Sequence, residues 1–161
     1  MAYTFDLYCE DEKSLDMAFI AFLWGGFLGS LYYGFIIEWK GRRYGLLESL
    51  LMMTGGIYIS FIAGSITIFS IGVFFFNAGF RGFFNASLLT LTEVMNETAR
   101  AATPMGLSIG WALGQIIIAI LGYWISNWRI LFIITAIPLT ALIYASYKHT
   151  LESPRFLVIK H

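Results

Sequence analysis

Long runs of uncharged residues are the feature that most constrains how this chain can fold. Residues 17–37, 103–128 and 130–147 carry no charged side chain. Each run can cross a hydrocarbon core of about 30 Å as a helix that rises about 1.5 Å per residue. The composition agrees, because 58% of the residues are hydrophobic and 12% are charged, against about 25% charged residues in a typical soluble domain. These runs therefore predict transmembrane segments.

The longest apolar stretch must contain a break. Residues 44–80 hold one charged residue, Glu48, and are too long for a single span, so we expect the chain to break at Gly64-Ser65. Backbone polar groups in lipid need internal partners, and the runs are continuously apolar instead of alternating, which favours helices over a β-barrel. The sequence predicts an all-α integral membrane protein, a bundle of five transmembrane helices near residues 17–37, 44–63, 66–93, 103–128 and 130–147.

Lysine and arginine residues beside the spans predict the orientation of the bundle. One side of the membrane has only Lys13 and Arg129. The other side receives seven basic residues, namely Lys40, Arg42, Arg43, Arg100, Lys148, Arg155 and Lys160. We therefore expect the first hairpin and the tail 148–161 on the cytoplasmic side. The acidic segment 1–16 is then expected on the non-cytoplasmic side.

Several function classes find no support in the sequence. The formal net charge is +0, which gives no argument for binding nucleic acid. His149 and His161 lack the spacing of metal ligands, and no nucleotide-binding loop or nucleophile–base pair is present. We therefore expect no enzyme activity, no catalytic residues, no metal and no cofactor. The lipid bilayer is the expected partner, and the sequence does not name a substrate.

The stretch GSLYYGFIIEWKGRRYGLL places a short charged hairpin between two apolar runs. Gly34 is followed by an acid, Glu38, and then by Gly41-Arg42-Arg43. Gly41 permits a sharp turn, and we expect Gly34 to let neighbouring helices approach. The two arginines fit the inner interface, and a topology signal alone is the simplest interpretation of basic residues in a short loop. The spacing of the acid, the glycine and the paired arginines favours a further role for these residues besides a topology signal.

This spacing resembles the signature between the second and third helices of the major facilitator superfamily, in its organic cation and sugar transporter branches. FDLYC at residues 5–9 is similar to the outer segment before the second helix, and ESPRFL at residues 152–157 looks like the segment after the sixth. The resemblance implies the partial N-terminal half of a major facilitator fold, equivalent to helices two to six. In that family the substrate binds between two halves that rock against each other, so this chain would need a second half.

The resemblance also implies that the hairpin residues form a cytoplasmic charge network that latches one conformation. Glu93, at the end of the third span, and Glu152 with Arg155 in the tail are its other implied members. We expect Arg42 or Arg43 to pair with Glu93 or Glu152. An exposed pair contributes about 0–1 kcal/mol, so the network would act as a latch and not as a structural foundation.

Arg81 lies in the middle of the third span. A charge at the bilayer centre costs at least about 2.5–3.5 kcal/mol, so this side chain must face protein or water. Asn77, Arg81 and Asn85 follow at intervals of four residues and share one helix face. One interpretation is a polar stripe on a central cavity, in which Arg81 binds an anionic group or a partner's carboxylate. The other is a structural cation capped by backbone carbonyls and the two asparagines.

The fourth span carries Gly106, Gly110 and Gly114, a repeated small-xxx-small pattern. Such a pattern lets helices pack closely in lipid, so we expect helix packing at these glycines. Gln115 lies away from the centre of the stripe and is a further polar candidate for the cavity. Hydrogen bonding between helices is the alternative for its amide.

Two functions remain open from the sequence. The first is a half transporter for small organic solutes, which needs a second half for alternating access and belongs to the plasma membrane by resemblance. The second is a non-transporting, transporter-derived structural subunit that joins other membrane subunits, in an organelle such as the mitochondrial inner membrane. A chain complete from Met1 favours the second function, whereas the intact hairpin and Arg81 favour descent from a working carrier.

Overall fold

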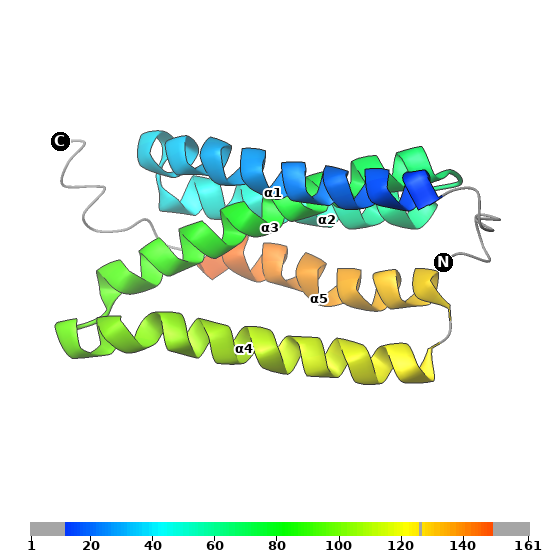
Figure 1. Cartoon of the computed structure of the whole chain (residues 1–161). Helices are drawn as coiled ribbons and strands as arrows, with labels where there is room; N and C mark the ends of the chain where they lie inside the picture. The colour runs from blue at the N-terminus through cyan, green and yellow to red at the C-terminus, as the bar shows by residue number, and fades with distance from the viewer. Residues whose placement is uncertain (1–11, 126, 150–161) are drawn as a thin grey trace.

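The computed structural model describes residues 12–125 and 127–149, and the five predicted transmembrane helices are present there. Their bounds are α1 Glu12–Lys40, α2 Arg42–Ile62, α3 Ile66–Val94, α4 Glu97–Trp124 and α5 Trp128–His149. They run back and forth between two ends of a bundle (Figure 1). We call the end that contains the α1–α2 link the hairpin end; α3 and α5 finish there and α4 begins there. Each helix is long and apolar enough to cross a membrane, so the chain is an integral multi-pass membrane protein.

Side-chain oxygens cap the starts of α3 and α5. The predicted break before α3 is confirmed, and Ser65 Oγ accepts a hydrogen bond from the Ile68 N–H at 3.4 Å. The predicted span 103–128 agrees with the membrane-spanning part of α4, Ala102–Trp124, at its start and extends beyond it at its end. At the start of α5, Asn127 Oδ1 accepts a hydrogen bond from the Arg129 N–H at 3.1 Å. Uncharged runs therefore mark the lipid-facing length, whereas the starts of α3 and α5 coincide with local side-chain caps.

Helices α1, α2 and α3 form the closely packed part of the bundle (Figure 1). The backbones of α2 and α3 touch at glycines. A Cβ at Gly56 would overlap the Phe76 backbone nitrogen, and a Cβ at Gly79 would overlap the Met53 backbone nitrogen. Close approach of this kind stabilises helix pairs in lipid, where the hydrophobic effect does not drive association. The buried core cluster at the hairpin end of this unit consists of Tyr33, Ile37 and Ala86.

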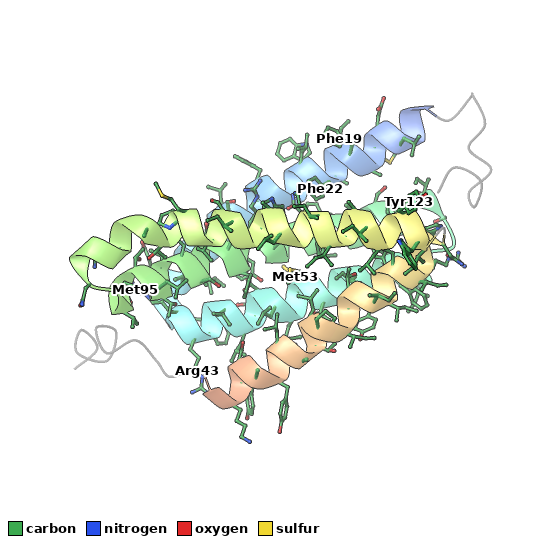
Figure 2. The ribbon with its side chains drawn as sticks, turned by 90° about the horizontal axis from the view of Figure 1, so that it is seen from below. Phe19, Phe22, Arg43, Met53, Met95 and Tyr123 are labelled. Carbon is green, nitrogen blue, oxygen red and sulfur yellow. The ribbon has the colours of Figure 1, made fainter. Side chains whose placement is uncertain are left out.

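Helices α4 and α5 are joined to this unit through aromatic contacts. The rings of Phe80 in α3 and Trp111 in α4 have centroids 4.8 Å apart, and those of Phe69 in α3 and Trp128 in α5 are 5.9 Å apart. In the most apolar segment of each helix, 0% of the segment is buried in α4 and 6% in α5, against 44% in α2. The two helices come together at their connecting turn, near Tyr123, and diverge toward the hairpin end (Figure 2). Both therefore expose long apolar faces.

The predicted packing glycines of α4 have no neighbour in the described part of the chain. A Cβ added to Gly106, Gly110 or Gly114 would meet no atom within 4 Å. No described helix lies against that face of α4, so close packing at these glycines stays a prediction. The spacing of small residues shows that a face can be approached closely, but not that this chain supplies the neighbour.

Replacement of Gly56 by alanine should destabilise the bundle. The new Cβ would overlap backbone atoms of α3, and overpacking of this kind typically costs about 1–3 kcal/mol. Gly55→Ala is the matched control, since a Cβ there meets nothing within 4 Å and alanine favours a helix over glycine by about 0.5–1 kcal/mol. Thermal unfolding of the purified protein in detergent measures both effects. Equal transition temperatures for the two variants would contradict the predicted backbone contact.

Candidate functional site

The hairpin between α1 and α2 turns on a glycine in a conformation that other residues rarely adopt. Gly41 is buried, with φ 99° and ψ 163°. Its carbonyl accepts a hydrogen bond from the Gly45 N–H at 3.1 Å. A side chain at this φ would be strained, so glycine is the residue that closes the turn without cost. The predicted sharp turn at Gly41 is confirmed, and it brings the end of α1 beside the first residues of α2.

Arg42, the first residue of α2, forms an ion pair with Glu93 near the end of α3. The atoms Arg42 Nη2 and Glu93 Oε1 are 2.8 Å apart, and the two side chains are 23% and 14% exposed. The bond joins segments 51 residues apart in the sequence. It is one of the pairings that the sequence predicts. The geometry ties the hairpin to the end of α3.

Two further arginines at the hairpin end donate to backbone carbonyls. Arg43 Nη2 donates to the Tyr147 carbonyl oxygen near the end of α5 at 3.1 Å, and Figure 2 shows Arg43 beside that helix end. Arg100 Nε donates to the Thr92 carbonyl oxygen of α3 at 2.9 Å. Carbonyls in the last turn of a helix lack partners within the helix, so cations are favourable there. Arg43 of α2 thus binds the end of α5, and Arg100 of α4 binds the end of α3.

The other predicted members of the charge network do not join it in the described part of the chain. Gly34 is exposed, and a Cβ there would meet nothing within 4 Å, so the expected close approach of a helix at Gly34 is wrong for the described chain. Glu38 is exposed and forms no hydrogen bond with a described residue. Glu152 and Arg155 lie outside the described residues.

Asn77 connects two helices and does not face a cavity. Its side chain is 2% exposed, and Nδ2 donates to the Phe22 carbonyl oxygen of α1 at 2.7 Å. A Cβ at Gly26 would lie 2.6 Å from that nitrogen, so Gly26 leaves the space that the amide occupies. The prediction of a cavity role for Asn77 is therefore wrong. The four-residue spacing identified a face of α3, but α1 covers that part of the face.

Arg81 lies one turn beyond Asn77 and is exposed. Its Nε is 3.5 Å from the position of a Cβ at Gly26, and it forms no hydrogen bond with any described residue. The asparagines and carbonyls that could have capped it as a structural cation do not do so among the described residues. Asn85 is half-buried, and Gln115 on α4 is exposed. Arg81 is thus a cation at mid-span that is left open to a group from outside the described chain.

Glu48 is a site candidate that the sequence patterns alone did not single out. It lies in α2, and its Oε1 accepts a hydrogen bond from the Tyr32 hydroxyl of α1 at 2.9 Å. A lone acid inside a predicted span was the available signal, because ionisable residues within membrane helices mark functional sites. Tyr32 could not be found in this way, since its contact with Glu48 depends on how α1 packs against α2.

Comparison with known proteins gives matches over almost the whole chain. Residues 3–161 match the family model described as sugar (and other) transporter. The chain is 25% identical over 154 residues to the organic cation/carnitine transporter 2 of Homo sapiens. It is 28% identical over 158 residues to solute carrier family 22 member 6 of Danio rerio and 28% over 159 residues to the steroid transmembrane transporter SLC22A24 of Homo sapiens. These relatives are membrane transporters, not enzymes.

The alignments cover the chain far more completely than they cover the relatives. They include 95%, 96% and 97% of this chain, but 28%, 27% and 28% of the three relatives in the same order. The chain therefore spans less than a third of the length of the curated relatives it matches. The family match agrees with the five membrane helices and with the Gly41-Arg42-Arg43 hairpin. The chain belongs to the sugar (and other) transporter family of the major facilitator superfamily and corresponds to an N-terminal part of such a transporter.

Proposed function

We propose that the chain acts as part of the N-terminal half of a facilitator-type carrier for small organic solutes, in the plasma membrane, together with further membrane helices. The names of its relatives refer to organic cations, carnitine and steroids, which supports solute transport as the activity. The observation that carries the proposal is the Arg42–Glu93 ion pair beside the Gly41 turn. It joins α2 to α3 and can form in one conformation and break in another.

The placement of the ion pair on its two helices supports a latch. Arg42 begins α2 and Glu93 is next to the last residue of α3. A cation at a helix N-terminus and an anion at a C-terminus each oppose the helix dipole. Neither charge stabilises its own helix, so each depends on the other. An ion pair of this kind favours the conformation that brings α2 and α3 together at this end, and it leaves both charges unfavourably placed when they separate.

The exposed faces of α4 and α5 support the need for additional helices. A carrier that works by alternating access requires two parts around a central site. The faces of α4 and α5 are uncovered in the described part of the chain, and the Gly106, Gly110 and Gly114 stripe lies on α4. We propose that this stripe packs against a helix from outside residues 12–149. Packing of small residues at such a contact is the interaction that lipid favours.

Arg81 is the residue that we propose to bind an anionic group in this carrier. The side chain is exposed at mid-span without a hydrogen-bonding partner among the described residues. An uncompensated guanidinium in a membrane is costly, so it must meet water or an anion. A carboxylate is the group that matches its planar set of donors. The carboxylate would come from a substrate or from a partner helix.

Disruption of the ion pair should lower uptake without preventing membrane insertion. The protein and its accompanying chains would be purified in mild detergent, placed in liposomes and assayed with carnitine, an organic cation and a steroid. We expect Arg42→Ala and Glu93→Gln each to reduce uptake by about fivefold or more, the range of a coupling of 1–3 kcal/mol. The exchange of both charges, Arg42→Glu with Glu93→Arg, should restore much of the uptake. It should also raise the unfolding temperature, because each charge then suits its helix end.

Arg100→Ala is the control for the loss of a cation at the same end, since Arg100 donates to a backbone carbonyl and not to a carboxylate. It should change uptake little. If liposomes that contain the protein and its co-purifying partners take up none of the substrates, the carrier proposal fails. Stoichiometric association with a large complex of non-carrier proteins would then support a structural subunit.

A crosslinking probe on the glycine stripe should reach a helix outside the described residues. In a Cys9→Ser background, benzophenone attached to Gly110→Cys should crosslink to protein. Attached to Ile116→Cys it should react mainly with lipid, because residue 116 lies about 120° around the helix at ~100° per residue. Peptide mass spectrometry would identify both products. Lipid adducts alone from the cysteine at position 110 would contradict packing at the stripe.

Arg81→Gln should weaken binding of the anionic group while leaving the fold intact. We expect uptake of an anionic substrate to fall by about tenfold or more, since a charge-assisted bond is worth about 1.5–3 kcal/mol. Arg81→Lys should retain part of the activity, because it keeps the charge but loses the paired donors. Equal uptake by all three proteins would contradict a role in binding. A uniform loss for anionic and cationic substrates would instead indicate a partner's carboxylate.

A further inference from the structure

Glu48 is an acid held inside the membrane-spanning part of α2. It follows the start of the helix at Arg42 by six residues, which corresponds to about 9 Å along the axis at 1.5 Å per residue. Its short side chain cannot extend to water as lysine and arginine do. An ionised carboxylate in this position requires partners for both oxygens, because an unpaired charge away from water is strongly unfavourable.

The structure supplies a partner for one of the two oxygens. Oε1 accepts the hydrogen bond from the Tyr32 hydroxyl at 2.9 Å. Oε2 is buried and has no hydrogen-bonding partner in the described part of the chain. A single neutral donor does not compensate a buried charge, whereas a proton on Oε2 removes that charge. The arrangement thus suits a carboxyl group that binds a proton.

The charged and titratable groups around Glu48 do not offer an alternative counter-ion among the described residues. On α1, the hydroxyl of Tyr33 donates to Met52 Sδ at 3.3 Å, and Lys40 lies over the Tyr44 ring at 4.5 Å. On α2 itself, Arg42 is paired with Glu93 of α3, and Arg43 donates to the Tyr147 carbonyl oxygen. On α5, the groups at this end are Tyr144, Tyr147 and Lys148. None of them forms an ion pair with Glu48.

We propose that Glu48 and Tyr32 form a proton-binding site within the membrane, near the hairpin end. The proton comes from water at that end and forms an O–H bond on Glu48 Oε2. Its release to water leaves the carboxylate, which the Tyr32 hydroxyl stabilises through Oε1. No other bond forms or breaks. The site uses neither the Arg42–Glu93 pair nor Arg81, so it does not depend on the proposed carrier activity.

Dicyclohexylcarbodiimide tests the site, because this apolar reagent attacks protonated carboxyl groups in apolar surroundings. The full chain in liposomes would be treated from about pH 5 to about pH 9, a range above the reference carboxyl pKa values, and peptide mass spectrometry would locate the adduct. We expect an adduct on Glu48 that decreases several-fold toward alkaline pH. In Tyr32→Phe the carboxylate loses its donor, so labelling at the alkaline end should exceed that of the parent protein. Glu93, paired with arginine, should stay unlabelled and serves as the internal control.

Infrared spectroscopy gives a second reading that needs no reagent access. The C=O stretch of a protonated carboxylic acid should be present in the parent protein and in Tyr32→Phe, and it should be lost in Glu48→Gln. Absence of both the adduct and the Glu48-dependent band would overturn the proposal. Labelling of Glu48 that is equal at every pH would also overturn it, as would unchanged labelling in Tyr32→Phe. If Glu48→Gln fails to fold, the labelling comparison between the parent protein and Tyr32→Phe still decides the outcome.

Discussion

Backbone contact between α2 and α3 is the constraint on which the rest of this structure depends. Side chains and lipid tails are similarly apolar, so helices in a membrane gain little from burial alone and associate where they pack closely. Gly56 and Gly79 allow that approach, and Gly29 allows α1 to approach the other side of α3. The resulting unit fixes the start of α2 beside the end of α3. Arg42 can therefore reach Glu93, and the ion pair is a consequence of packing and not its cause.

The packing is distributed unevenly, and this has consequences for function. The first three helices share glycine contacts and a buried core, whereas α4 touches α3 through aromatic rings and through an arginine at the hairpin end. Helix α5 lies along α2, but most of its apolar surface, like that of α4, stays uncovered among the described residues. Open apolar faces on membrane helices are suited to further helices. A mid-span cation such as Arg81, exposed on α3, likewise needs a group that the described residues do not provide.

Individual residues show what sequence patterns can predict about this structure and what they cannot. The turn at Gly41 was predictable because it joins two runs with almost no residues between them. The Arg42–Glu93 pair is one of several pairings that the resemblance implied, and the sequence did not choose among them. Asn77 was assigned to the wrong environment, since four-residue spacing defines a helix face but not the helix opposite. The α4 glycines show the same limit, because a small-residue stripe reveals what a face could accept. The contact of Tyr32 with Glu48 was out of reach, as it depends on how α1 packs against α2.

The sequence by itself determined that the described part of this chain holds five membrane-spanning helices, that a break precedes α3, and which end carries the charged hairpin. These properties follow from the length of uncharged runs and from turn chemistry, and both act locally along the chain. Only the tertiary structure decided that Asn77 links two helices, and that no described residue binds Arg81 or the second oxygen of Glu48. Each of these depends on which helix faces which. That choice is made by the fit of backbones at a few glycines, which no local pattern specifies.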